Sequence, residues 1–331
     1  MARRIKKRTK RKLTKAVISL ILVVIAAFFG YFFKDKLPGG FLGNDATVGG
    51  PIDGIPAVTD PNYLTVHYID VGQGDSIFLA CGGEYMLIDA GETDSDDTVI
   101  RYLNNLGIEE LDLVVATHAH SDHIGEMDDV LSAIAADVVW YPDYRHGTQT
   151  ETAFLTAAEN CGANLYEPEL GETYDLGGAT VTVLGPVKQY EDPNDMSIVV
   201  LVQFGDDRFL FTGDMEKEES AETDLVEYWE SIDADKLKAD VLKVGHHGSN
   251  TSTSYRFLRA VSPSYAVISV GEGNKYKHPN QETLDILGQA EVYVYRTDYM
   301  GTVVAVSDGT EITFGWRNTD QMPYIPEPKS E

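Results

Sequence analysis

The chain has 331 residues and is 43% hydrophobic, which is enough for a folded core in one or two domains and excludes a disordered protein. Residues 1–36 contain 11 of the 26 basic residues and a single acidic one, so the remainder carries 15 basic and 52 acidic residues, a net charge of −37. Proteins that track along DNA usually present a basic surface, so this charge argues against processive DNA binding. The two cysteines, Cys81 and Cys161, lie in no CxxC motif and predict neither a cysteine metal site nor a disulfide framework. We expect them to be buried singly, with a bridge as the alternative for a domain outside the cell.

The N-terminal segment predicts a membrane anchor. Residues 16–33 contain no charged residue, and as a helix they extend about 27 Å, close to the thickness of the hydrocarbon layer. A cleaved signal peptide and a buried soluble helix are the alternatives. The basic residues before this segment favour a cytoplasmic N-terminus. We therefore expect a single-pass protein of the cell membrane, with the lipid bilayer as a partner and the acidic body outside the cell.

Composition changes along the chain predict its domains. Residues 37–60 are rich in Gly, Pro and Asp and show no apolar period, whereas strand and helix patterns follow them and three prolines end the chain. The predicted parts are a basic cytoplasmic stub at 1–15, a transmembrane signal-anchor helix at 16–33, a linker at 37–60, one hydrolase-like domain at 61–318 and a flexible tail at 319–331.

Hydrophobic periodicity predicts two strand-rich halves with helices between them. Glycines near the ends of several helical patterns are expected C-caps, and Gly-Asp-Asp at 205–207 predicts a hairpin. The expected strands of the first half are 63–71, 76–81, 84–91 and 111–120, and those of the second are 179–186, 197–214, 239–248, 265–271, 291–297 and 301–316. The expected helices are 97–107, 123–136, 150–162 and 280–290. This pattern favours an α/β fold in which two sheets pack face to face with helices outside, a four-layer αββα sandwich.

Four potential metal ligands are concentrated at the end of one predicted strand. The stretch "HAHSDH" brings His118, His120, Asp122 and His123 into six positions, where a solvated polar loop is the plainer alternative. Imidazole and carboxylate together favour Zn, Mn or Fe over Mg or Ca. The two histidines one residue apart can bind one ion, and the aspartate and histidine that follow can bind a second.

Other strands end in further candidates. Asp214 follows "RFLFTG" and can bridge two ions, and His246 with His247 follows "DVLKVG". Paired ions lower the pKa of a bound water and stabilise charge on a substrate, so this arrangement favours hydrolysis.

The ordered motifs resemble a known family. "IDVGQGDSIFL", "MLIDAG", "THAHSDHIGEM", "NDMSIVVLVQFGDDRFLFTGDME", "DVLKVGHHGS", "NKYKHP" and "YRTDYMGTVV" are similar to the metallo-β-lactamase fold superfamily, and within it to the C-terminal hydrolase domain of the ComEC family of competence proteins. The resemblance covers roughly residues 63–316. It implies an αββα sandwich with two divalent metal ions, zinc or manganese.

The same resemblance implies roles for individual residues. His118 and His120 correspond to ligands of the first ion, Asp122 and His123 to ligands of the second, and Asp214 to the bridging aspartate. The last ligand corresponds to His246 or His247, with His247 slightly favoured because a small residue follows it. The usual third histidine of the first ion is missing, and Asn194 and Asp195 stand in its place, where either can approach the ion directly or through water. Ser197 in this segment is a further candidate. Asp122, Asp214 and His278 are the expected catalytic residues.

Secondary candidates have a functional and a structural interpretation. Asp70 and Asp75 flank "VGQG", where they orient ligand histidines or shape a glycine turn. Asp89 is expected to support a ligand or a turn rather than bind metal. For His278 the functional interpretation is contact with substrate or donation of a proton, and the structural one is a plain surface loop. His146 has the same two interpretations with the structural one favoured, and His67 and the stretch 228–232 are expected to be structural.

These observations lead to a functional hypothesis and its rivals. The resemblance implies a phosphodiesterase, specifically a nuclease acting on DNA. A phosphorylcholine or teichoic-acid phosphodiesterase, or another ester or amide hydrolase of this fold, is the alternative of the same class, and β-lactam hydrolysis fits the motifs less well. A non-catalytic module stabilised by metal is the alternative of another class. Because the chain has one predicted span instead of the many of ComEC proteins, a role in DNA uptake requires partner membrane proteins.

Overall fold

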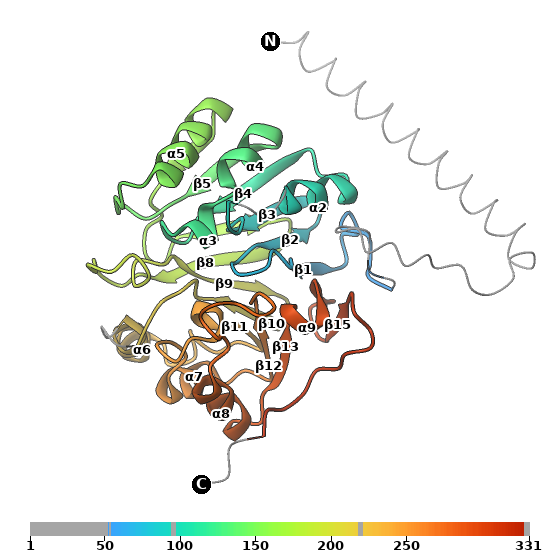
Figure 1. Ribbon diagram of the computed structural model, residues 1–331, viewed down its shortest axis with the longest axis vertical. Helices are drawn as coiled ribbons and strands as arrows, with labels where there is room; N and C mark the ends of the chain where they lie inside the picture. Colours follow the sequence, from blue (N-terminus) through green and yellow to red (C-terminus); the bar gives the residue numbers. More distant parts are fainter. Residues whose placement is uncertain (1–51, 53, 94–96, 218–220, 328–331) are drawn as a thin grey trace, which may run out of the picture. The chain divides into compact units, whose positions relative to one another are not determined.

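The computed structural model describes residue 52 and residues 54–93, 97–217 and 221–327 (Figure 1). The chain divides into two units, residues 1–47 and 48–331, and every described residue belongs to the second. The predicted stub and transmembrane segment, and most of the predicted linker, lie outside the described residues. Among the residues that are described, no helix is long and apolar enough to cross a membrane.

Eight strands form the first sheet, in the order β15-β14-β1-β2-β3-β4-β5-β6. Their bounds are β1 Leu64–Tyr68, β2 Ile77–Cys81, β3 Glu84–Ile88, β4 Glu110–Val115, β5 Ala135–Trp140, β6 Asn164–Tyr166, β14 Val303–Ser307 and β15 Ile312–Trp316. Strands β3 to β6 run parallel to one another, whereas the pairs from β15 to β3 are antiparallel. The parallel strands therefore end on one edge of the sheet.

Seven strands form the second sheet, in the order β13-β12-β11-β10-β9-β8-β7. Their bounds are β7 Thr173–Leu176, β8 Ala179–Gly185, β9 Val199–Phe204, β10 Asp207–Phe211, β11 Val241–Lys243, β12 Tyr265–Ile268 and β13 Tyr293–Arg296. Strands β10 to β13 are parallel, and β9 and β10 form the antiparallel hairpin expected from Gly-Asp-Asp. A parallel stretch thus forms in each sheet.

Helices cover the outer face of each sheet (Figure 1). The first sheet carries α2 Thr98–Leu106, α3 Ser121–Ile124, α4 Met127–Ala133 and α5 Gln149–Cys161, and the second carries α6 Ala221–Ile232, α7 Tyr255–Val261 and α8 Gln281–Gln289. Short helices, α9 Thr297–Met300 and the 3₁₀ turn Gly245–Gly248, complete the described elements.

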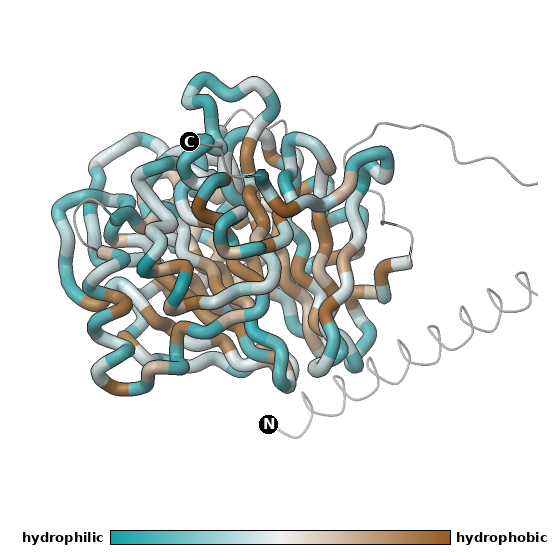
Figure 2. The backbone as a smooth tube through the Cα atoms, turned by 90° about the horizontal axis from the view of Figure 1, so that it is seen from below, coloured by the Kyte–Doolittle hydropathy of each residue, from teal (hydrophilic) through white to brown (hydrophobic). Residues whose placement is uncertain are grey.

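Three apolar clusters hold these layers together. Alternating side chains of β1 illustrate the arrangement, since Leu64, Val66 and Tyr68 face the second sheet, while His67 faces α2 and hydrogen-bonds with Tyr102 (2.8 Å). One cluster lies between the sheets and the other two between each sheet and its helices. Figure 2 shows the hydrophobic residues along the central strands and hydrophilic ones toward the periphery. The predicted four-layer αββα sandwich is confirmed.

Several elements differ from expectation. The helix expected at 123–136 is two helices, because the backbone N–H of Gly125 hydrogen-bonds with the carbonyl of Gly91 (2.8 Å) in the loop after β3. Gly107 and Gly162 are left-handed C-caps as expected, but Gly288 lies inside α8. The pattern did not predict strands β5, β6 and β7 or helices α6 and α7. Strands β14 and β15 were expected with the second half of the chain but belong to the first sheet. Both cysteines are free thiols.

Residues 319–327, within the expected tail, contact the second sheet. The backbone groups of Tyr324 and Val294 exchange hydrogen bonds of 2.8 and 3.3 Å. The Tyr324 hydroxyl accepts a hydrogen bond from Arg296 (3.3 Å). This part of the tail is therefore attached to the edge strand β13.

Candidate metal centre

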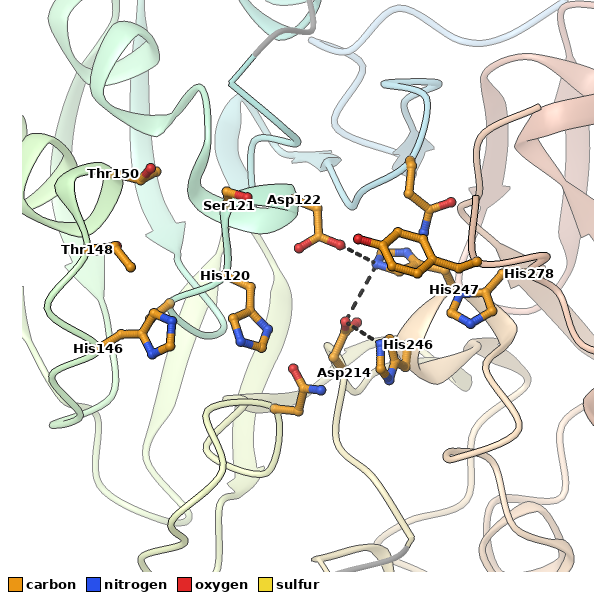
Figure 3. A pocket seen from close by; sticks show the side chains of 14 residues that line it. His120, Ser121, Asp122, His146, Thr148, Thr150, Asp214, His246, His247 and His278 are labelled. Carbon is orange, nitrogen blue, oxygen red and sulfur yellow. Dashed lines mark ion pairs between the residues drawn. The ribbon is translucent and has the colours of Figure 1, made fainter. Parts of the chain in front are cut away.

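The parallel strands of both sheets deliver polar side chains to one cleft. The loop after β4 carries His118 and His120 and continues into α3, β10 is followed by Asp214, and β11 leads to the turn Gly245–Gly248. The carboxyl ends of parallel strands share an edge, and this is where α/β proteins usually bind ligands. Figure 3 shows His120, Asp122, Asp214, His246 and His247 around the cleft.

Two groups of candidate ligands lie side by side. In the first, His118 Nε2 and His120 Nδ1 are 3.2 Å apart. In the second, Asp122, His123, Asp214 and His247 each offer a ligand atom, and these atoms all lie within 4.8 Å of one another. The rings of His118 and His123, one from each group, have centroids 4.1 Å apart.

The spacing within the second group matches ligands of one ion. His123 Nε2 lies 3.2 Å from Asp214 Oδ1, and His247 Nε2 lies 3.3 Å from Asp122 Oδ2. Ligand atoms bound tetrahedrally at about 2.05 Å are separated by about 3.3 Å. His123 Nε2, His247 Nε2 and Asp214 Oδ1 are also buried without a hydrogen-bond partner in the described chain. These orphaned atoms and their separations fit a divalent metal ion.

His123 is held from behind by Asp89. The ring Nδ1 of His123 lies 2.7 Å from Asp89 Oδ2. Thr117 donates both its backbone N–H (2.8 Å) and its hydroxyl (2.7 Å) to the same carboxylate. Such outer partners fix the orientation of a ligand histidine and raise its basicity. Asp89 thus lies behind a candidate ligand and contacts its ring.

His247 is held by the carbonyl of Ser269 and lies beside Asp75. His247 Nδ1 donates to the carbonyl of Ser269 (3.1 Å) and lies 3.3 Å from Asp75 Oδ1. The other oxygen of Asp75 is paired with Lys243 Nζ at 2.7 Å. Asp70, in contrast, accepts the backbone N–H of Gly72 (3.2 Å) and so has the turn-shaping role.

Ser197 connects the two ligand groups. Its hydroxyl oxygen lies 3.4 Å from His118 Nδ1 and accepts the backbone N–H of Asp214 (3.1 Å). Asn194 lines the cleft, and its buried Oδ1 has no hydrogen-bond partner in the described chain. Asp195 Oδ1 accepts the backbone N–H of Glu216 (2.9 Å). Of the two residues in place of the missing histidine, Asn194 is therefore the one that faces the cleft.

The paired histidines have different surroundings. His247 belongs to the compact ligand group, whereas His246 Nε2 lies 3.7 Å from Asp214 Oδ2. His246 Nδ1 is 2.8 Å from Glu216 Oε1, which also accepts the hydroxyl of Thr251 (2.7 Å). Both histidines have positive φ angles, 49° and 53°, in this turn. Their ring planes are 74° apart. The geometry favours His247 as the ligand and places His246 on the cleft wall.

The pKa values of the second ligand group reflect this crowding of charge. Burial disfavours the charged form of each side chain in this group. The carboxylates of Asp214 and Asp89 outweigh this effect at His123 and raise its pKa well above the ordinary value. Asp214 and Asp75 likewise raise the pKa of His247 to about 10 despite its burial. His123 and His247 in turn lower the pKa of Asp214 well below its usual range.

Two further histidines lie on opposite walls of the cleft, whose volume is about 480 Å³. The His146 ring centroid is 5.3 Å from that of His120, and the His278 ring centroid is 5.6 Å from that of His246 (Figure 3). Burial, together with His246 and His247, lowers the pKa of His278 to about 4. His67 is buried on Thr65 and Tyr102, away from the cleft, in the structural role expected.

Lys243, Glu216 and Thr117 are residues of this site that the sequence reasoning missed. Lys243 had a signal, because a charged residue interrupts the apolar run "VLKVG", and such a residue needs a buried partner. Glu216 and Thr117 had no signal beyond their nearness to ligand candidates. The predicted packing role of the stretch 228–232 holds for Trp229, which is buried and donates to the carbonyl of Leu184 (2.8 Å).

Comparisons with known proteins agree with the fold. The family model described as the metallo-beta-lactamase superfamily matches residues 69–272. "ComE operon protein 3" of Bacillus subtilis is 34% identical over 72% of this chain and 32% of that protein. "Competence protein ComA" of Neisseria gonorrhoeae is 31% identical over 75% of this chain and 33% of that protein. The chain thus spans about a third of the length of these curated relatives.

A solved structure supports the fold alone. The metallo-beta-lactamase fold protein YhfI of Bacillus subtilis is 13% identical, with a TM-score of 0.50 over 74% of this chain and 99% of that protein.

Proposed function

The chain belongs to the metallo-beta-lactamase superfamily, and we propose on this basis that it is a membrane-anchored, metal-dependent phosphodiesterase acting outside the cytoplasm. The observation that carries the proposal is the compact group of Asp122, His123, Asp214 and His247, in which His123 Nε2 lies 3.2 Å from Asp214 Oδ1. The rings of His118, from the first group, and His123 have centroids 4.1 Å apart. Residues 16–33 supply the proposed anchor.

The donor set suits two divalent ions of the zinc or manganese type. His118 and His120 would hold one ion, with Asn194 beside it, and Asp122, His123 and His247 would hold the second, with Asp214 between the two sites. Bound divalent ions supply a nucleophilic hydroxide near neutral pH and stabilise the charge that develops on the phosphoryl oxygens. A site built from imidazole and carboxylate supports this choice of metals.

The remaining residues would position the substrate. His278 Nδ1 is buried without a hydrogen-bond partner in the described chain, and its lowered pKa keeps the ring neutral at pH 7. A neutral ring at the cleft wall would hydrogen-bond with the substrate rather than attract it by charge. His146 on the opposite wall and Thr148 beside it would contact the other side of the ester.

Substrate class is the finer part of the proposal. A relative in Neisseria gonorrhoeae named for competence and one in Haemophilus influenzae named for recombination support DNA as the substrate. The acidic body opposes long contacts with a polyanion, so we propose local binding at the cleft rather than processive tracking. A phosphorylcholine or teichoic-acid ester is the competing substrate.

Metal content and turnover of the full chain test this function. The assay compares bis(p-nitrophenyl) phosphate, single-stranded DNA, double-stranded DNA and p-nitrophenyl phosphorylcholine. We expect metal-dependent hydrolysis that falls by at least about 10²-fold in His120→Ala and Asp214→Ala. Asp175→Ala is the control, because Asp175 is exposed, does not line the cleft, and accepts the backbone N–H of Gly178 (3.0 Å).

The relative rates then decide between the candidates. Faster cleavage of DNA supports the nuclease, and faster cleavage of phosphorylcholine ester supports the cell-wall enzyme. Stoichiometric metal without turnover of any phosphodiester would contradict the proposal and favour a metal-stabilised binding module.

A further inference from the structure

An exposed tyrosine between two lysines stands at the rim of the cleft. Lys275, Tyr276 and Lys277 follow β12 in the loop that ends at His278. We propose that Tyr276 stacks on a base of a single-stranded polynucleotide while Lys275 and Lys277 contact its backbone phosphates. This inference rests on the proposed phosphodiesterase function and names its substrate class.

Tyr276 presents aromatic surface that the protein itself leaves uncovered. The residue is 51% exposed, yet it lines the cleft together with Asp122, Asp214 and His247. Among the large hydrophobic residues found exposed in the described ranges, it is the one that lines this cleft. Aromatic surface exposed at a binding site favours a ligand with a flat face, because stacking removes that surface from water.

Hydrogen bonds hold the loop on both sides of the tyrosine. The side-chain amide of Asn274 donates to the carbonyls of Gly271 (3.0 Å) and His278 (2.7 Å), and its oxygen accepts the backbone N–H of His278 (3.0 Å). The His278 ring stacks on Tyr276, with centroids 5.6 Å apart and an interplanar angle of 24°. A ring placed in advance loses little conformational freedom when it binds, so its contact contributes fully to affinity.

The lysines give the rim a local positive charge on an acidic protein. Both are exposed, and Lys275 Nζ lies 4.9 Å from the Tyr276 ring centroid. Its hydrogen bond with Tyr276 raises the pKa of Lys275, and the carboxylates of Glu92 and Asp122 add to this, so Lys275 keeps its positive charge at neutral pH. Phosphates flanking the scissile one would meet these ammonium groups at the cleft entrance.

Stacking at an exposed rim requires a base with a free face. Bases in a duplex are stacked on their neighbours and paired, so a duplex cannot offer one without local opening. A polyol phosphate has no planar ring for Tyr276 to contact. Single-stranded polynucleotide is therefore the substrate class that uses both the ring and the cations.

Binding to two matched oligonucleotides tests the inference. One is a labelled oligothymidylate and the other an abasic strand of the same length and charge, and fluorescence anisotropy measures their affinity for the full chain in chelator, where cleavage cannot occur. We expect the wild type to bind the base-containing strand at least about fivefold more tightly. Tyr276→Ala should reduce this ratio to near one, and Tyr276→Phe should keep it.

Control variants separate stacking from charge and from folding. Tyr255→Ala removes a tyrosine that is 52% exposed but does not line the cleft, so the ratio should stay at the wild-type value. Lys275→Gln should weaken both oligonucleotides by the same factor and reduce the salt dependence of binding.

Each outcome has a definite meaning. An equal loss on both strands in Tyr276→Ala, or no loss on either, overturns the stacking role. If the metal-loaded wild type cleaves phosphodiesters but binds the two strands equally, the proposed function survives and this inference fails. If the metal-loaded wild type cleaves none of the phosphodiesters, the proposed function is wrong. The ratio of the two affinities then still tests whether Tyr276 binds a base.

Discussion

Lys243 Nζ and Asp75 Oδ2 form a 2.7 Å ion pair directly behind the candidate metal centre, with neither side chain more than 1% exposed. Burial raises the pKa of Asp75, but Lys243 and then His247 outweigh it and lower the pKa to about 2. The carboxylate is therefore ionised at pH 7 and can orient His247 through its other oxygen. Lys243 compensates for this negative charge where water cannot reach it.

Replacing Lys243 with Met should destabilise the protein strongly. Removing one partner leaves a buried charge unpaired, which costs about 3–5 kcal/mol, and urea denaturation of the chelator-treated chain measures it. Lys238→Met is the control, because Lys238 pairs with Asp235 on the surface and should contribute less than about 1 kcal/mol. The double variant with Asp75→Asn should recover part of the loss. A Lys243→Met protein as stable as the control would contradict the assigned role.

Asp89→Asn should weaken metal binding while the fold persists. Asp89 holds His123 at 2.7 Å, and outer partners of ligand histidines typically contribute a factor of about 10–100 in metal affinity. Competition titration against a chelator measures this loss. Asp175→Asn removes an exposed carboxylate and should change nothing. Equal affinities for wild type and Asp89→Asn would show that His123 is not a ligand or needs no support.

The candidate site could be predicted where ligands are neighbours in sequence. The spacing of His118 and His120 alone predicts a shared ion, and their nitrogens are indeed 3.2 Å apart. The pairing of Asp75 with Lys243 could not be predicted, because it joins strand ends that meet only after both sheets pack. Likewise, the return of β14 and β15 to the first sheet depends on packing and not on the alternation within each strand.

The choice between His246 and His247 shows a different limit. Both follow β11 and carry the same side chain, so local pattern treats them alike. Their ring partners separate them, because His246 contacts Glu216 whereas His247 donates to the carbonyl of Ser269, and neither contact has a sequence signature. Only the folded turn indicates which ring joins the compact ligand group.

His247→Asn and His246→Asn should therefore have different effects on metal content. Loss of His247 removes a ligand from the second ion and should reduce the bound metal after dialysis by about one ion per chain. Loss of His246 should leave the metal content close to that of wild type. Elemental analysis of both variants measures this difference. Metal lost in His246→Asn and retained in His247→Asn would reverse the assignment.

Glu222 should make stability fall as pH rises. Burial raises the pKa of Glu222 from 4.5 to about 7, although its carboxylate accepts backbone N–H groups from Thr253 and Ser254 that favour the ionised form. Below pH 4.5 both the folded and the unfolded chain are protonated at this group. Between pH 4.5 and 7 the folded chain retains a proton that the unfolded chain has released, so the free energy of unfolding decreases with pH, by about 3 kcal/mol in all.

Glu222→Gln should remove this contribution, because an amide does not titrate. Urea denaturation of chelator-treated wild type and variant at pH 5 and pH 7.5 measures this. The free energy of unfolding of the variant should rise relative to that of the wild type as pH rises. Glu227→Gln, in the same helix and exposed, is the control and should follow the wild type at both pH values. The two proteins share every other titratable group, so any difference between their pH profiles of unfolding free energy comes from Glu222. Parallel profiles would show that Glu222 is ionised in the folded chain throughout this range.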